Sequence, residues 1–183
     1  MREAGLHHWI TYGALLGLIR DGELIKWDTD VDIALGPDIS FAAVETALTT
    51  AGMPISKTRS ANGRVNMAKF LCGNTAGDIF MTQNVGNKLL TYEGKSPHIF
   101  VFSHLYAGVE MREFNGVKLP VPKNAETYLS HIYGPNWRKP AKLWSWKYSA
   151  FNLEAVHCVG LRGVYSWGVG WLKWQVRRAC KLL

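Results

Sequence analysis

Acidic and aliphatic positions alternate in the segment from Ile25 to Leu35. Asp28, Asp30 and Asp32 stand at every second position there, and the residues after Asp30 are otherwise aliphatic. Side chains two positions apart in a strand point to the same side. A turn would more often carry Gly, Asn or Pro and would lack this alternation. The pattern therefore predicts a strand over residues 25–35 with three carboxylates along one side.

Short strands and helices are predicted in alternation along the rest of the chain. Helices are expected over residues 14–20, from Asp38 or Ser40 to about Ala51, and from Asn124 to Tyr133, because capping residues and glycines bound them. Further strands are expected over residues 8–12, 55–59, 65–71, 77–81 and 99–102, and a hairpin over 111–121 that turns at Asn115-Gly116. This alternation indicates an α/β or α+β domain.

Composition narrows the class of protein further. Of the 183 residues, 48% are hydrophobic and 19% charged, which is typical of a globular domain and not of a disordered chain. No apolar run reaches the ~18–20 residues that a membrane-spanning helix needs, and the first residues do not resemble a signal peptide. Cys72, Cys158 and Cys180 are too few and too widely spaced for a disulfide framework or a zinc site. Cysteines that form no disulfide framework suit a reducing compartment, so we expect a cytoplasmic protein.

The positive charge of the chain is concentrated near its C-terminus. Residues 1–140 hold 14 Lys or Arg against 13 Asp or Glu, whereas residues 141–183 hold seven against one. We expect a catalytic domain over residues 1–143 and a basic, Trp-rich tail over 144–183. Trp and basic residues together favour peripheral contact of residues 160–183 with the inner face of a membrane, and the alternative is a helix packed on the domain. Nucleic acid is not the expected partner, because only the tail combines basic and aromatic residues.

The acidic row suggests a metal site. Carboxylates that crowd together repel one another and raise each other's pKa unless a cation lies between them. Hard oxygen ligands suit Mg²⁺ or Mn²⁺, and such ions commonly act with substrate phosphates in phosphoryl transfer. The alternative is a solvated acidic turn.

Two further positions fit the same site. Gly13 lies at a junction of strand and helix, where backbone N–H groups can bind a phosphate, although a glycine there is often only a turn. Asp78 lies inside the apolar strand 77–81, where a carboxylate needs a partner. It either completes the metal site and accepts a proton from an attacking hydroxyl, or caps a neighbouring element or pairs with Arg20 or Lys69. Lys69 either contacts a donor phosphate or is an exposed or ion-paired strand lysine.

These motifs together resemble the LicD/fukutin family of the nucleotidyltransferase superfamily. The similar segments are WITYGALLGLIR (residues 9–20), IKWDTDVDI (25–33), GDIF (77–80) and YLSHIYGPNW (128–137). They occur in the family's order and extend over residues 6 to about 140. The resemblance implies a nucleotidyltransferase-like fold, in which helices flank a mixed β-sheet.

The resemblance also implies an activity: transfer of a phospho-alcohol, such as phosphocholine or ribitol or glycerol phosphate, from a CDP-activated donor to a glycan hydroxyl. The implied roles are metal binding by Asp30 and Asp32, and completion of the site by Asp78, which also serves as base. The resemblance implies that Gly13, Ala14 and Gly17 line the donor phosphates and that Arg20 neutralises charge on the pyrophosphate. Trp27 is implied to stack on a base or sugar of the substrate. Asp28 matches the first acid of the family's acidic row and is counted among the substrate-binding residues. The alternative for Trp27 is a core position.

The chain departs from the family pattern at Ala14, where the family has Ser or Thr. We expect weaker donor binding from this missing hydroxyl, and fewer acceptor-recognition elements because the chain is short. One alternative function is transfer of a nucleoside monophosphate from an NTP to a small acceptor. Another is a catalytically weak module that binds an anionic polymer, although an idle acidic cluster would be destabilising.

Overall fold

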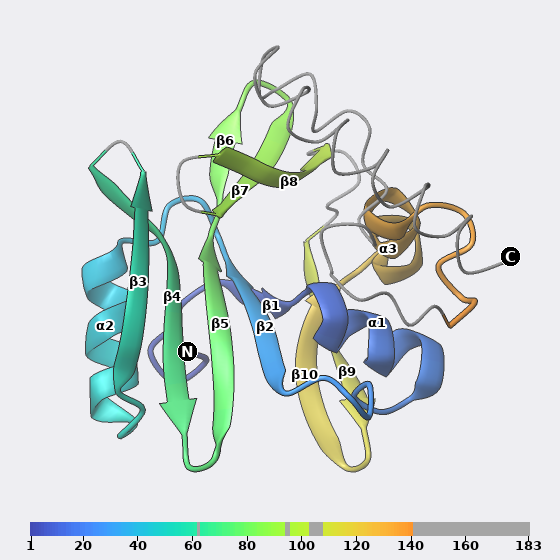
Figure 1. Cartoon of the computed structure of the whole chain (residues 1–183), viewed down its shortest axis with the longest axis horizontal. Helices are drawn as coiled ribbons and strands as arrows, with labels where there is room; N and C mark the ends of the chain where they lie inside the picture. The colour runs from blue at the N-terminus through green and yellow to red at the C-terminus, as the bar shows by residue number, and fades with distance from the viewer. Residues whose placement is uncertain (62, 94–95, 103–107, 141–183) are drawn as a thin grey trace, which may run out of the picture.

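The computed structural model describes residues 1–61, 63–93, 96–102 and 108–140. A five-stranded mixed sheet lies at its centre (Figure 1). The strand order is β1 (His8–Ile10), β2 (Asp30–Leu35), β5 (Thr75–Met81), β4 (Arg64–Cys72) and β3 (Ile55–Ala61). Neighbours β2 and β5 are parallel, and the other pairs are antiparallel. The sheet therefore places the acidic strand beside the strand that carries Asp78.

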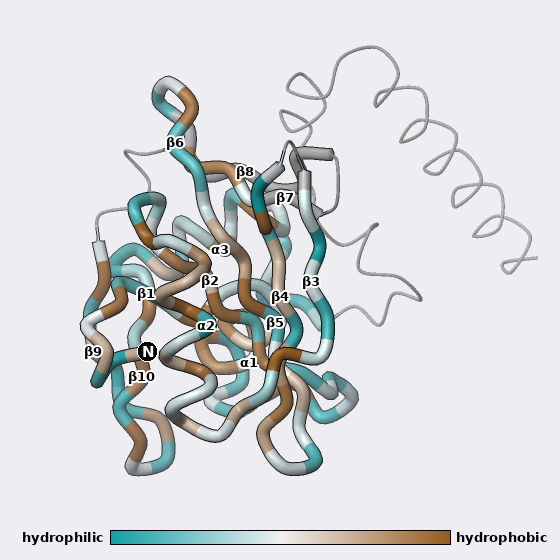
Figure 2. Tube along the Cα trace, turned by 90° about the vertical axis from the view of Figure 1, so that its left-hand side faces the viewer, coloured by the Kyte–Doolittle hydropathy of each residue, from teal (hydrophilic) through white to brown (hydrophobic). Residues whose placement is uncertain are grey.

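Helices cover both faces of this sheet. On one face, Met67 and Phe80 pack in a hydrophobic cluster with α1 (Tyr12–Asp21), α3 (Ala125–Tyr133) and Val121 of β10. On the other face, α2 (Phe41–Thr50) contributes Val44 and Leu48 to a second cluster with strand residues of β2, β4 and β5. Figure 2 shows that β3, at the edge of the sheet, is largely hydrophilic. The site of interest lies on the α1 face.

Two smaller sheets complete the described structure. One is the hairpin of β9 (Val109–Phe114) and β10 (Val117–Pro122), and the other consists of β6 (Gln83–Val85), β7 (Lys88–Glu93) and β8 (Ser96–Phe102). The predicted turn of the hairpin is confirmed, because Asn115 and Gly116 both have the positive φ values, 49° and 81°, of a type I′ turn. The predicted cap of α2 is also confirmed, since Ser40 Oγ accepts a hydrogen bond from Ala43 N at 3.3 Å.

The mixed α/β class with flanking helices is confirmed, and several predicted boundaries are wrong. The strand begins at Asp30 and not at residue 25, because residues 23–25 pack closely on α1 at Gly17 and keep this segment off the sheet. Tyr12 begins α1 and does not end β1. The sequence pattern did not predict β6 or β7.

The predicted tail over residues 144–183, with its expected membrane contact, lies outside the described residues. Within the described residues, no helix is long and apolar enough to cross a bilayer.

Candidate active site

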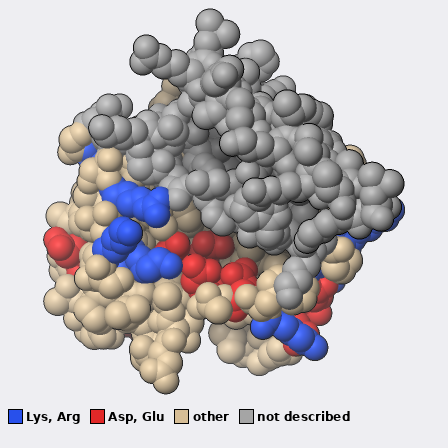
Figure 3. Space-filling view, viewed as in Figure 1, with Lys and Arg blue, Asp and Glu red and all other residues tan. Residues whose placement is uncertain are grey.

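Four carboxylates gather where β2, β5 and the start of α1 meet, and we call Asp28, Asp30, Asp32 and Asp78 the carboxylate cluster. Asp32 and Asp78 are direct neighbours across the parallel pair of β2 and β5. Asp30 lies two residues earlier on β2 and therefore points to the same side. Asp28 precedes the strand in a turn in which its N–H bonds to Ile25 O at 2.9 Å. Figure 3 shows acidic atoms together over this part of the sheet.

Gly13 brings the first turn of α1 against this cluster. Its backbone N–H donates to Asp32 Oδ2 at 3.1 Å. A Cβ built on Gly13 would lie 2.4 Å from Asp28 Oδ2 and 3.6 Å from Asp32 Oδ2. The absence of a side chain at residue 13 therefore lets the carboxylates approach a helix N-terminus, where N–H groups and the helix dipole favour negative charge.

The cluster holds more negative charge than its surroundings balance. Burial, followed by the charges of Asp30, Asp28 and Asp78, raises the pKa of Asp32 to about 8. Burial and a hydrogen bond with Asp30 raise the pKa of Asp28 to about 6. Closely placed, partly buried carboxylates show such upward shifts where no cation compensates their charge directly.

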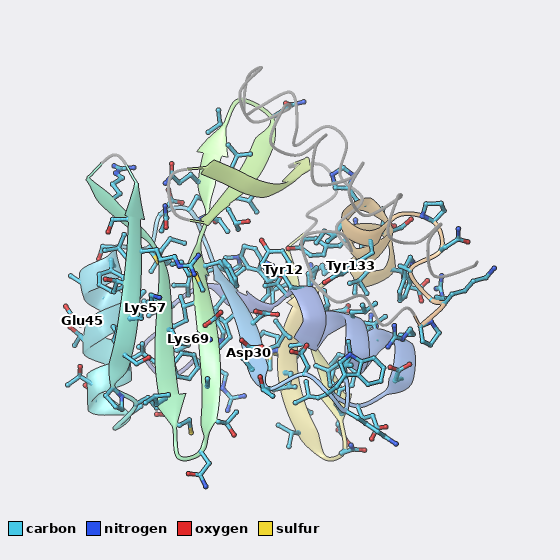
Figure 4. All side chains as sticks on the ribbon, viewed as in Figure 1. Tyr12, Asp30, Glu45, Lys57, Lys69 and Tyr133 are labelled. Atoms are coloured by element: carbon cyan, nitrogen blue, oxygen red, sulfur yellow. The ribbon has the colours of Figure 1, made fainter. Side chains whose placement is uncertain are left out.

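Lys69 is the cation that the described structure places in this cluster. Residue 69 is the register partner of Asp78 on the antiparallel strand β4. Its Nζ lies 3.1 Å from Asp78 Oδ1 and 3.4 Å from Asp30 Oδ2. Figure 4 shows Lys69 and Asp30 on the same side of the sheet, from β4 and β2. The sequence left open whether Lys69 contacts a donor phosphate or is an exposed or ion-paired strand lysine, and the structure shows the ion-paired lysine. Lys69 was also one of the two ion-pair partners considered for Asp78.

Of the other predicted substrate contacts, Arg20, Gly17 and Ala14 make contacts within the protein, and Trp27 is exposed. Arg20 is in the last turn of α1 and makes two hydrogen bonds to Asp21, at 2.8 and 2.6 Å. A Cβ on Gly17 would lie 2.6 Å from Glu23 O, so glycine is needed there for close packing. The Ala14 side chain belongs to the hydrophobic core. Trp27 is 54% exposed, which excludes the core position considered for it.

Two tyrosines that were not predicted as site residues, Tyr12 and Tyr133, lie next to the carboxylate cluster. Tyr12 has φ of 45°, a strained value for a bulky residue, and its hydroxyl forms a hydrogen bond with Thr91 of β7. Tyr133 of α3 lies close enough to the cluster that burial and the charge of Asp32 raise its pKa. Both lie between the start of α1 and α3 (Figure 4). The only sequence signal for Tyr133 was its place in the YGPNW segment.

We expect Gly13→Ala to weaken binding of the CDP-activated donor that the family resemblance implies by about tenfold or more, with little loss of stability. The added Cβ overlaps Asp28 Oδ2, and this flexible carboxylate can move, so the fold survives while the cluster is displaced. Titration of CDP in the presence of Mg²⁺, beside a melting curve, tests this. Gly52→Ala is the control for a loss of stability alone: Gly52 follows α2, its φ of 68° makes alanine strained there, and no side chain of the cluster lies within 4 Å of its Cβ position, so the melting temperature should fall while CDP affinity stays unchanged. Unchanged CDP affinity in Gly13→Ala would show that the approach of Gly13 to the carboxylates is incidental.

Comparison with known proteins identifies the family. The family model described as "LicD/FKTN/FKRP, nucleotidyltransferase domain" matches residues 5–124. A mouse protein named ribitol-5-phosphate transferase FKTN is 25% identical over 162 residues, which are 84% of this chain and 34% of that protein. An uncharacterized protein from Rickettsia prowazekii, RP689, is 25% identical over 146 residues, 76% of this chain and 52% of that protein. The chain thus spans about a third of the mouse relative.

Among solved structures, the lincomycin-bound lincosamide antibiotic adenylyltransferase LnuA is similar with a TM-score of 0.47 and 13% identity. The similarity covers 71% of this chain and 78% of that one. The family match includes β1, α1, β2, β5 and all four members of the carboxylate cluster. The chain belongs to the LicD/FKTN/FKRP nucleotidyltransferase domain family.

Proposed function

We propose that this protein transfers a phospho-alcohol group from a CDP-activated donor to a hydroxyl of a glycan. The observation that carries the proposal is the pairing of Asp32 with Asp78 across β2 and β5, beside Asp30 and the N–H of Gly13. The mouse relative is named for ribitol-5-phosphate transfer, so ribitol phosphate is favoured over phosphocholine and glycerol phosphate as the transferred group.

The residues of the cluster fit a divalent cation by their chemistry. Carboxylate oxygens are the ligands that Mg²⁺ and Mn²⁺ prefer, and the raised pKa of Asp32 indicates negative charge in need of compensation. Among the described residues, no three potential ligands already stand in the arrangement of a metal site, and Lys69 is bound between Asp30 and Asp78. Asp30, Asp32 and Asp78 would hold the ion once Lys69 moves away. The ion would neutralise the donor diphosphate and the leaving nucleotide.

The protein's own groups account for the remaining steps. The acceptor oxygen forms a bond to the phosphorus that carries the alcohol, and the bond from that phosphorus to CMP breaks, so CMP leaves with the electron pair. Asp78 takes the proton of the acceptor hydroxyl, since it lies beside Asp32 in register at the centre of the cluster. Backbone N–H groups of the first turn of α1 bind donor phosphate, and the exposed ring of Trp27 stacks on the cytosine.

A thermal-shift experiment tests this function. CDP-ribitol, CDP-choline, CDP-glycerol, CTP and ATP are each added with Mg²⁺ or with EDTA. We expect one CDP-alcohol to raise the Tm by several degrees with Mg²⁺ only, because a ligand that binds only the folded state stabilises it. Release of CMP on addition of a glycan acceptor then confirms transfer. A shift with an NTP in place of the CDP-alcohols would indicate a nucleotidyltransferase, and no shift at all would contradict the proposal.

A further inference from the structure

Lys69 lies in the interior of the sheet, where a charged side chain needs a particular reason. Its strand, β4, has β5 on one side and β3 on the other, so protection of a sheet edge does not explain a lysine there. Residue 69 comes two positions after Met67, whose side chain packs in the hydrophobic cluster on the α1 face. The Lys69 side chain therefore points to the same face as the carboxylate cluster.

The ammonium group of Lys69 lies between two of the three carboxylates that would hold a metal ion. Its Nζ is 3.1 Å from Asp78 Oδ1 and 3.4 Å from Asp30 Oδ2. The third carboxylate, Asp32, accepts instead from the N–H of Gly13. Apart from the charge contact with Lys69, the buried Oδ1 of Asp78 has no hydrogen-bond partner in the part of the chain that the structure describes. The ammonium thus compensates the cluster only in part, and a buried oxygen of Asp78 keeps capacity to bind a cation.

A divalent ion and this ammonium cannot use the same oxygens together. Mg²⁺ binds carboxylate oxygens at about 2.1 Å, so an ion on Asp30 and Asp78 would lie within about 5 Å of Nζ as it now stands. Positive charges at that distance repel strongly in a partly buried site. The Lys69 side chain is 35% exposed, so its ammonium can move into solvent when an ion arrives. Uptake of the ion is therefore an exchange of one cation for another.

We propose that Lys69 is the positioning residue of the metal-free protein: its ammonium stands in for the divalent ion, holds Asp30 and Asp78 in place, and competes with the ion for both. The inference rests on the proposed function, because it takes the carboxylate cluster as the metal site, and it adds the residue that sets the metal affinity. Lys69 stabilises the metal-free protein and weakens metal binding, because the ion must break both ion pairs. A lysine with only a structural role would stabilise the protein equally with and without metal.

The test compares the wild type with Lys69→Met in the full chain, with Mn²⁺ alone as the probe. Methionine keeps an unbranched stem, and it brings neither a charge nor an oxygen ligand for the ion. Free Mn²⁺ is followed by EPR during a titration at physiological ionic strength. We expect the Kd of Mn²⁺ to fall by about tenfold or more in the variant, because the ion no longer has to displace a cation.

Urea unfolding gives a second measurement that is independent of activity. In EDTA, Lys69→Met should unfold at a lower urea concentration than the wild type, because its carboxylates have lost their cation. Saturating Mn²⁺ should remove most of this difference, because the ion then compensates the cluster in both proteins. The metal should therefore raise the urea midpoint of the variant more than that of the wild type.

Two further variants separate competition from other effects. Lys57→Gln removes one positive charge at the register partner of Lys69 on β3, where the side chain is exposed (Figure 4). It should change the Kd of Mn²⁺ by less than about threefold, because salt screens an exposed charge at this distance. Lys69→Arg keeps the positive charge and should bind Mn²⁺ no more tightly than the wild type. This variant also tests the proposal if Lys69→Met fails to fold.

Equal or weaker Mn²⁺ binding by Lys69→Met would overturn the inference, and so would an equal gain of affinity in Lys57→Gln or Lys69→Arg. A loss of stability that Mn²⁺ does not reduce would assign Lys69 a structural role alone. Asp32→Asn added to Lys69→Met should abolish tight binding, and binding that persists would place the ion outside the cluster. In these cases Mn²⁺ binding by the wild type is unaffected, whereas its absence from wild type and Lys69→Met alike would contradict the metal site of the proposed function as well.

Discussion

Asp32→Asn is expected to reduce transfer by roughly a thousandfold or more while the protein stays folded. The carboxylate of Asp32 lies at the centre of the cluster, beside Asp78 in register and bonded to Gly13 N. Asn keeps the shape of the side chain and an oxygen that can accept from Gly13, but it removes the negative charge that a divalent cation needs. CMP release from the preferred CDP-alcohol is the measurement, and Asp30→Asn is expected to behave in the same way.

Glu45→Gln is the matched control for this loss. Glu45 is an exposed carboxylate on α2, away from the carboxylate cluster (Figure 4), so its neutralisation should leave the rate unchanged. A melting temperature of the Asp32 variant in EDTA at or above that of the wild type would show that the fold is intact. Turnover within a factor of a few of the wild type in either variant would contradict a metal site at these residues.

The sequence pattern predicted the central part of the site because its residues lie in regular elements. Asp30 and Asp32 follow the two-residue period of a strand, and Asp78 lies inside a short apolar segment that was predicted as a strand. No local pattern says that these strands are parallel neighbours in register. That relation depends on the crossover between them, and the sequence indicated it only through family resemblance.

Residues in irregular backbone could not be placed in this way. Asp28 was expected on the strand, but it reaches the cluster from a turn, and the packing of residues 23–25 against Gly17 decides its position. The positive φ of Tyr12 is likewise imposed by tertiary contacts, with Phe80 in edge-to-face geometry and with Thr91. Single-sequence patterns carry no signal for such contacts, because the partners are far apart in the chain.

Metal-free protein is expected to lose stability as the pH rises from 5 to 8. Burial and the neighbouring carboxylates raise the pKa of Asp32 to about 8 in the folded state, whereas an unfolded Asp titrates near 4. Between these values the folded protein binds a proton that the unfolded chain lacks, so the free energy of unfolding falls with rising pH. Asp28, with a pKa of about 6, adds a contribution of the same sign at the lower end of this range.

The difference between wild type and Asp32→Asn reports the titration of Asp32 together with its coupling to the neighbouring carboxylates, since the groups away from the cluster are common to both. Urea unfolding in EDTA at pH 5, 6, 7 and 8 should show the wild type losing stability relative to the variant, by on the order of a few kcal/mol over the range. Mg²⁺ should restore the wild type at pH 8, because the ion replaces the proton, and should have little effect on the variant. Parallel pH curves for the two proteins would mean that Asp32 ionises freely, and the charge crowding from which the metal site is argued would not exist.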